Sequence, residues 1–160
     1  MRTPASIAGH PIHPMIVPLA IGGFLLSFIF DIVCLATGHV DPWATVAFYT
    51  MIGGVVGALV AAVFGLVDLL SLPSGSYMKH IALTHMGINL VVVALFACNA
   101  WLRHNEVNPS GTPFILSVVG ILLLVVSGWL GGKMVYEAGV GVDGVATPLE
   151  GKRTDRSVHA

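Results

Sequence analysis

Four long apolar runs constrain this chain more than any other feature. They cover residues 14–37, 43–72, 80–102 and 113–134. A helix needs about 20 apolar residues to cross the hydrocarbon core of a bilayer, and each run reaches that length. The segments between them, TGHVDPW, SLPSGSY and NEVNPSGTP, carry the glycine, proline, asparagine and aspartate that end helices. The chain is therefore predicted to be an all-α polytopic membrane protein with four transmembrane helices.

Composition supports the membrane class and excludes others. Of the 160 residues, 56% are hydrophobic and only 9% are charged, whereas a soluble domain carries about a quarter charged residues. The formal net charge of −1 gives no reason to expect a nucleic-acid partner. Cys34 and Cys98 lie within apolar runs and form no C-x-x-C motif, so both are expected to be buried small hydrophobic residues.

Short connections predict an antiparallel up-down-up-down bundle. The N-terminus, the second connection and the C-terminus then share one side of the membrane. Six of the seven lysines and arginines fall on that side, and Arg103 is the exception. The positive-inside rule therefore predicts that this side is cytoplasmic. We expect residues 1–136 to form the transmembrane domain and residues 137–160 a flexible cytoplasmic tail. No internal repeat is evident in the sequence.

Ionisable side chains gather at the expected cytoplasmic end. His10 and His13 open the first span, His85 lies in the third, and Asp68 is near the end of the second. Ionisable residues are costly within a membrane, so they indicate a functional site. His80 belongs to the same end, but it is about 140° around the helix from His85 and is assigned to the membrane interface.

Each candidate also has a structural alternative. His85 shares a helix face with Asn89 one turn further on, and it is predicted either to point inward as a ligand or to form a polar pair between helices. His13 is followed by a proline, which disfavours helical angles, so it either binds a cofactor or caps the helix. His10 could be a loop residue in the headgroup region, and Asp68 could be a hydrogen-bond acceptor.

Two further features belong to the interior of the bundle. Residues 53, 57, 61 and 65 form a stripe of small side chains on the second span. Such a stripe predicts close helix packing, or alternatively room for a flat cofactor beside the backbone. At the opposite end, Asp31 is predicted to have a structural role and to pair with Arg103 or His104.

Four stretches, in this order, resemble the DUF2231 family of small bacterial membrane proteins: HPIHPMIVPLAIG, GLVDLL, THMGIN and WLGGKMVYEAGVGV. The resemblance covers about residues 8–143 and implies a four-helix membrane domain in the bacterial inner membrane. Some family members are fused to Rieske or cytochrome domains, which implies electron transfer near a quinone pool. By this resemblance His10, His13, Asp68 and His85 match the polar positions of the family. Many relatives carry HPxxVHFP where this chain has HPMIVPLA, so one histidine of those relatives is absent.

Three functions follow from these features. The first is an inner-membrane redox protein that binds b-type haem through His85 and either His13 or His10. The second is a compact zinc, iron or copper site built from His10, His13, Asp68 and His85. The third is an accessory subunit of a larger complex in which the histidines only hold helices together.

The expected partners are the lipid bilayer and either further copies of the chain or a redox complex. The sequence contains no G-x-S-x-G, P-loop or H-E-x-x-H motif, so activity as an enzyme by itself is not expected.

Overall fold

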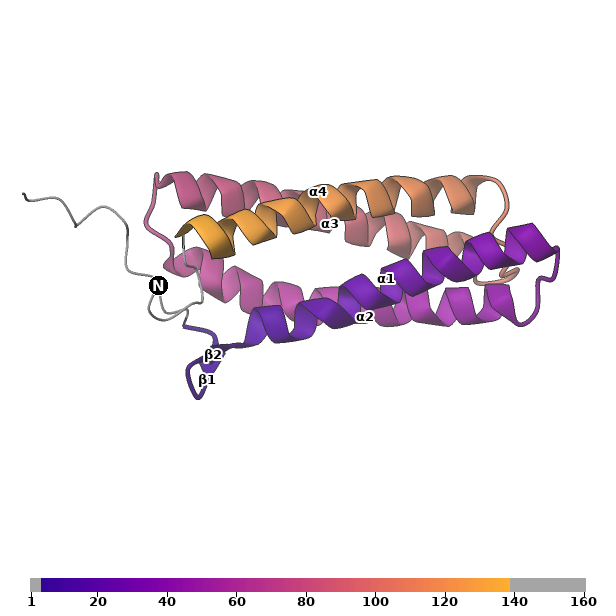
Figure 1. Ribbon diagram of the computed structural model, residues 1–160, viewed down its shortest axis with the longest axis horizontal. Coiled ribbons are helices and arrows are strands. Elements are labelled where there is room, and N and C mark those ends of the chain that lie inside the picture. Colours follow the sequence, from indigo (N-terminus) through magenta and orange to yellow (C-terminus); the bar gives the residue numbers. More distant parts are fainter. Residues whose placement is uncertain (1–3, 139–160) are drawn as a thin grey trace, which may run out of the picture.

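The computed structural model describes residues 4–138 of the chain. Four helices form an antiparallel bundle: α1 (Ile12–Thr37), α2 (Trp43–Ser71), α3 (Tyr77–Arg103) and α4 (Thr112–Ala138) (Figure 1). A short hairpin of β1 (Ser6–Ile7) and β2 (His10–Pro11) precedes α1. All four helices are long and apolar enough to cross a membrane, which confirms the predicted four-helix membrane fold.

The helix boundaries differ from the expected ones by a few residues. α1 begins at Ile12 after its N-cap Pro11, so His13 lies within the first turn and the alternative that it caps the helix was wrong. Pro14 also lies in that turn, where a proline removes no intrahelical hydrogen bond. α3 begins at Tyr77, where the Ser76 hydroxyl accepts a hydrogen bond of 3.2 Å from a backbone amide of the first turn. α4 extends to Ala138, past the expected end of the domain at 136. The rest of the expected C-terminal tail lies outside the described residues.

The N-terminal hairpin, the α2–α3 connection and the end of α4 share one end of the bundle, as the up-down-up-down topology requires (Figure 1). We call this the histidine end, because His13 and His85 lie there, and the other the far end. α1 packs chiefly on α2, and α3 on α4, so the bundle consists of two helical hairpins. α1 and α3 lie diagonally across it.

Glycines bring the helices of the first hairpin into backbone contact. A Cβ atom on Gly23 would lie only 2.6 Å from the Cα atom of Gly54. A Cβ atom on Gly57 would lie 3.1 Å from Leu19 Cγ. Small residues therefore allow close helix packing here, as the glycine stripe predicted.

The two hairpins repeat one pattern of contacts. A Cβ atom on Gly54 of α2 would lie 2.8 Å from the Phe24 ring of α1, and one on Gly120 of α4 would lie 2.7 Å from the Phe96 ring of α3. Phe24 of α1 and Phe96 of α3 are 72 residues apart in the chain, and the same interval separates Asp31 of α1 from Arg103 of α3. We call residues of α1 and α3 at this interval corresponding positions. An approximate two-fold axis along the bundle thus relates the hairpins. The two halves share contacts at a few positions and little sequence elsewhere, so the correspondence is one of structure and is not evident in the sequence.

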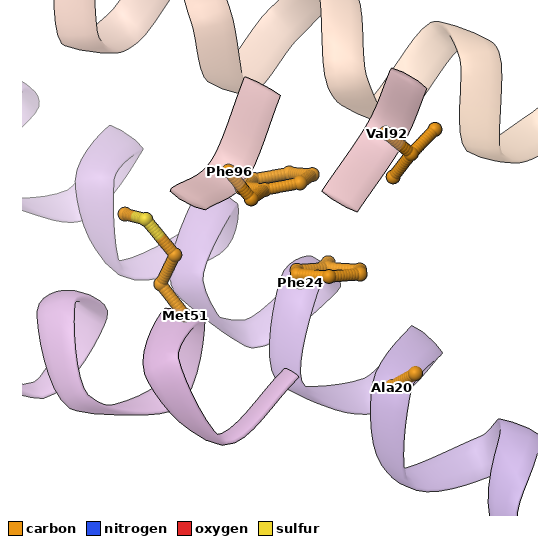
Figure 2. Packing of buried hydrophobic residues seen from close by; sticks show 5 residues of the cluster. All are labelled: Ala20, Phe24, Met51, Val92 and Phe96. Carbon is orange, nitrogen blue, oxygen red and sulfur yellow. The ribbon is translucent and has the colours of Figure 1, made fainter. Parts of the chain in front are cut away.

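The centre of the bundle lies on this axis. Phe24 and Phe96 stack there with ring centroids 4.2 Å apart and planes inclined by 10° (Figure 2). Ala20, Met51 and Val92 complete the buried cluster around them. The two phenylalanines therefore join the hairpins through one aromatic contact between corresponding residues.

The two cysteines have different environments. Cys34 is buried as expected, but Cys98 is exposed on the outside of α3, so that part of the expectation was wrong. Both are free thiols. A small apolar side chain such as cysteine fits a lipid-facing helix surface as well as a core, and the apolar run around it cannot distinguish the two.

Candidate functional site

Two histidines are held by the same hydrogen bond in the two hairpins. Nδ1 of His13 in α1 lies 2.8 Å from the carbonyl oxygen of Ala61 in α2. Nδ1 of His85 in α3 lies 2.9 Å from the carbonyl oxygen of Ser127 in α4. A carbonyl oxygen can only accept, so Nδ1 carries the proton in both rings. In the neutral form, Nε2 of each imidazole then holds the lone pair.

A glycine on the partner helix makes room for each of these rings. A Cβ atom on Gly65 would lie 2.9 Å from His13 Nδ1, and one on Gly131 would lie 3.3 Å from His85 Cε1. The space beside Gly65 is thus filled by imidazole.

The stripe itself differs by one residue from the sequence prediction. Gly57 and Ala61 are buried against α1 as expected, but Gly53 lies on the outer surface with no neighbour near its Cβ position. Gly54 takes its place in the interface. A spacing of four drifts around a helix of 3.6 residues per turn, so the strict four-residue series leaves the contact face.

His13 and His85 occupy corresponding positions of the two hairpins. They are 72 residues apart in the chain, as are the ion-paired residues Asp31 and Arg103. They extend from the diagonal helices α1 and α3 at the histidine end. We call these two residues, which lie at matching positions of the two hairpins, the histidine pair.

The two histidines differ in what contacts Nε2. The Asn89 side-chain amide nitrogen donates to His85 Nε2 over 3.0 Å and to the His85 carbonyl oxygen over 3.0 Å. The Ser127 hydroxyl in turn donates to Asn89 Oδ1 over 2.9 Å. Val17 occupies the position in α1 that corresponds to Asn89, and within residues 4–138 Nε2 of His13 has no such donor. The alternative of a polar pair between His85 and Asn89 is therefore realised in this conformation.

His10 and Asp68 make local contacts of their own. His10 is exposed in the N-terminal hairpin, with Nδ1 3.1 Å from the carbonyl oxygen of Ala8. Asp68 Oδ1 accepts a hydrogen bond of 3.1 Å from the backbone amide of Ala5 and so ties that hairpin to α2. His80 is exposed at the start of α3. Within residues 4–138 no three histidine, cysteine, aspartate or glutamate side chains are arranged to hold a metal ion.

The far end holds a second polar centre. Arg103 and Asp31 form an ion pair of 3.0 Å, and both side chains are fully buried. Asp31 was expected to pair with Arg103 or His104, and Arg103 is confirmed as the partner. Its guanidinium also donates to the backbone carbonyls of Ala44, over 3.3 Å, and Val107, over 2.8 Å.

Two members of this centre were not expected from the sequence. Asn99 donates to the Pro113 carbonyl oxygen over 2.9 Å and to the Ser117 hydroxyl over 2.8 Å. Ser117 donates to Asp31 Oδ2 over 3.4 Å. The only available signal was the spacing of four between Asn99 and Arg103, which places them on one face of α3.

These features define a four-helix membrane protein with a histidine pair at one end of the bundle and a buried ion pair at the other. The chain belongs to the DUF2231 family, described as predicted membrane proteins, whose family model matches residues 9–144. No curated protein and no solved structure matches the chain significantly.

Proposed function

We propose that this protein is a redox protein of the bacterial inner membrane that binds b-type haem through His13 and His85. The observation that supports this function is the matched pair of imidazoles. Each comes from a different hairpin, and each has Nδ1 bonded to a backbone carbonyl oxygen. Histidines that bind iron or another metal through Nε2 commonly donate Nδ1–H to such an oxygen.

The number of available ligands favours haem over a single metal ion. A haem iron takes two axial ligands from the protein, since the porphyrin supplies the rest. Zinc takes three or four protein ligands, and no group of three candidate ligands is found within residues 4–138. His10 and Asp68, the other members of the predicted metal set, are engaged in the N-terminal hairpin. We therefore place the compact metal site second.

The residues around the pair would prepare it for axial ligation. The carbonyl oxygens of Ala61 and Ser127 keep the proton on Nδ1, orient the rings and raise the basicity of Nε2. For His85 to bind, the Asn89 amide nitrogen has to leave Nε2, and it can keep its bond to the His85 carbonyl oxygen when it does. The haem, when bound, would supply one-electron transfer.

Charge distribution supports the orientation that completes the proposal. With both termini in the cytoplasm, every lysine and arginine except Arg103 lies on the cytoplasmic side. The histidine pair is then near the cytoplasmic surface, where it would exchange electrons with a partner on that side. The exposed apolar surface of the four helices leaves room for lipid, a second copy of the chain or a redox partner.

The test is an absorption spectrum of protein purified after expression with haem supplementation. We expect a Soret band and, on reduction, the sharp α band of six-coordinate haem. His13→Ala and His85→Ala should each lose that spectrum, whereas His39→Ala, at an exposed far-end position, should keep it.

Metal analysis of the same samples separates the alternatives. Stoichiometric zinc, iron or copper without haem would support the compact metal site. Protein that folds normally but contains neither haem nor metal would refute the proposal and leave the accessory-subunit interpretation.

A further inference from the structure

Two fully buried side chains at the centre of the bundle each have a polar atom without a hydrogen bond. The Ser27 hydroxyl in α1 and the Asn99 Oδ1 oxygen in α3 both have no hydrogen bond from the protein, and both side chains are 0% exposed. Buried polar atoms are nearly always hydrogen-bonded, because they lose their water on burial. These two atoms therefore indicate a ligand with hydrogen-bonding groups.

The two-fold relation places these side chains opposite each other. Ser27 and Asn99 are 72 residues apart in the chain, so they too occupy corresponding positions of α1 and α3. The pairs of residues one turn before and one turn after them have the same interval. One turn toward the histidine end, Phe24 and Phe96 meet across the axis with centroids 4.2 Å apart. One turn toward the far end, the ion pair crosses the axis with a distance of 3.0 Å. Ser27 and Asn99 thus form the layer between two layers that are in contact.

The layer of Ser27 and Asn99 has shorter side chains than the layers on either side of it. A phenyl ring or an arginine side chain is long enough to meet its counterpart across the axis, but a serine opposite an asparagine is not. The Asn99 amide nitrogen is also held by the Pro113 carbonyl and the Ser117 hydroxyl, so the amide cannot turn to satisfy Oδ1. The oxygen therefore needs a donor that the protein itself does not supply.

Charge decides which ligand fits. The neighbouring layer contains one carboxylate and one guanidinium, so it has no net charge. A cation would be repelled by Arg103 and an anion by Asp31 at close range in a low-dielectric interior. A neutral molecule that both donates and accepts meets neither penalty, and water is the one that fits between side chains of this size.

We propose that Ser27 and Asn99 bind a single water molecule on the two-fold axis. It donates one hydrogen bond to Asn99 Oδ1 and accepts one from the Ser27 hydroxyl. Its second proton is directed to Asp31 Oδ1, which contacts Arg103 in the ion pair but receives no hydrogen bond from the protein. The stacked phenylalanines separate this site from the histidine pair, so it is independent of the proposed haem.

The experiment detects water at the Asn99 amide by nuclear magnetic resonance in lipid nanodiscs. The full chain is labelled with 15N-asparagine, and nuclear Overhauser cross-peaks from the Asn99 side-chain protons are sought at the water frequency. We expect a cross-peak in the natural protein and in Ser27→Ala, which removes the hydroxyl but leaves the space. Ser27→Val fills the space and should abolish the peak.

Each outcome is decisive. Absence of the peak in the natural protein would overturn the proposal, whether or not the variants fold. Loss of the peak in Ser27→Ala would show that it came from the hydroxyl proton, and persistence in Ser27→Val would show that it came from elsewhere. Either result also overturns the proposal.

Discussion

Breaking the ion pair between Asp31 and Arg103 gives the sharpest test of how the hairpins are held together. Both side chains are fully buried, and the contact joins α1 of one hairpin to α3 of the other. Asp31→Asn keeps the shape of the side chain and removes the negative charge. The guanidinium then remains in a low-dielectric interior without a counter-charge, and removing one partner of such a pair costs about 3–5 kcal/mol.

The remaining contacts of Arg103 limit this loss without removing it. The guanidinium keeps its hydrogen bonds to the carbonyl oxygens of Ala44 and Val107. These neutral acceptors satisfy its N–H groups but do not balance its charge. We therefore expect the free energy of unfolding to fall by about 3 kcal/mol, the lower end of the range for buried pairs.

The assay is unfolding in mixed micelles with increasing dodecyl sulfate, followed by far-ultraviolet circular dichroism. The matched control is Glu137→Gln, which removes the partner of Lys133 in an exposed pair of 3.7 Å. Exposed pairs contribute about 0–1 kcal/mol, so the control should unfold almost like the natural protein.

A double variant separates the charge effect from packing. Asp31→Leu combined with Arg103→Met removes both charges, so it should be more stable than Asp31→Asn alone, since apolar replacement of a buried pair is often tolerated. An Asp31→Asn loss of less than about 1 kcal/mol, the value for exposed pairs, would refute the argument that this pair is desolvated.

Three further predictions concern the glycines and the topology. Gly57→Leu should destabilise the fold by about 1–3 kcal/mol, because a Cβ atom at this position would lie 3.1 Å from Leu19 Cγ. Gly53→Leu, on the outer surface, should change the free energy of unfolding little. Equal unfolding midpoints of the two variants in the same micelle assay would contradict the packing of α1 on α2 at Gly57. Gly65→Ala should displace the His13 ring, since the new Cβ would lie 2.9 Å from Nδ1, and shift the 15N resonances of that imidazole; unshifted resonances would show that the ring does not rest on this glycine. Alkaline phosphatase fused to the C-terminus should be inactive and green fluorescent protein fluorescent, because the charge distribution places that end in the cytoplasm; active phosphatase would reverse the orientation.

The two-fold relation gives these sites a common origin in the fold. At two pairs of corresponding positions in α1 and α3, a residue contacts its counterpart from the other hairpin. These contacts are the stacked rings of Phe24 and Phe96 in the middle of the bundle and the ion pair at the far end. Each layer has a different chemistry, although the backbone arrangement is repeated.

The sequence by itself determined the membrane class, the four spans and their antiparallel order. Hydrophobic length decides whether a helix can cross a bilayer, and short connections leave one arrangement for neighbours. Asp31 could also be limited to two candidate partners, Arg103 and His104, because an ionised group in the membrane has to be neutralised and few charges lie at its depth. The sequence further placed the candidate histidines at one end of the bundle.

Only the tertiary structure decided which of those residues share a site. Helix rotation selects the side chains that face the axis, and in uniformly apolar helices the hydrophobic pattern carries little information about rotation. The structure places His13 against α2 and His85 against α4, directs Asp68 to the N-terminal hairpin and leaves His10 exposed. It also reveals the repeat, because contacts such as those of Gly54 with Phe24 and Gly120 with Phe96 correspond in space while the surrounding sequences differ.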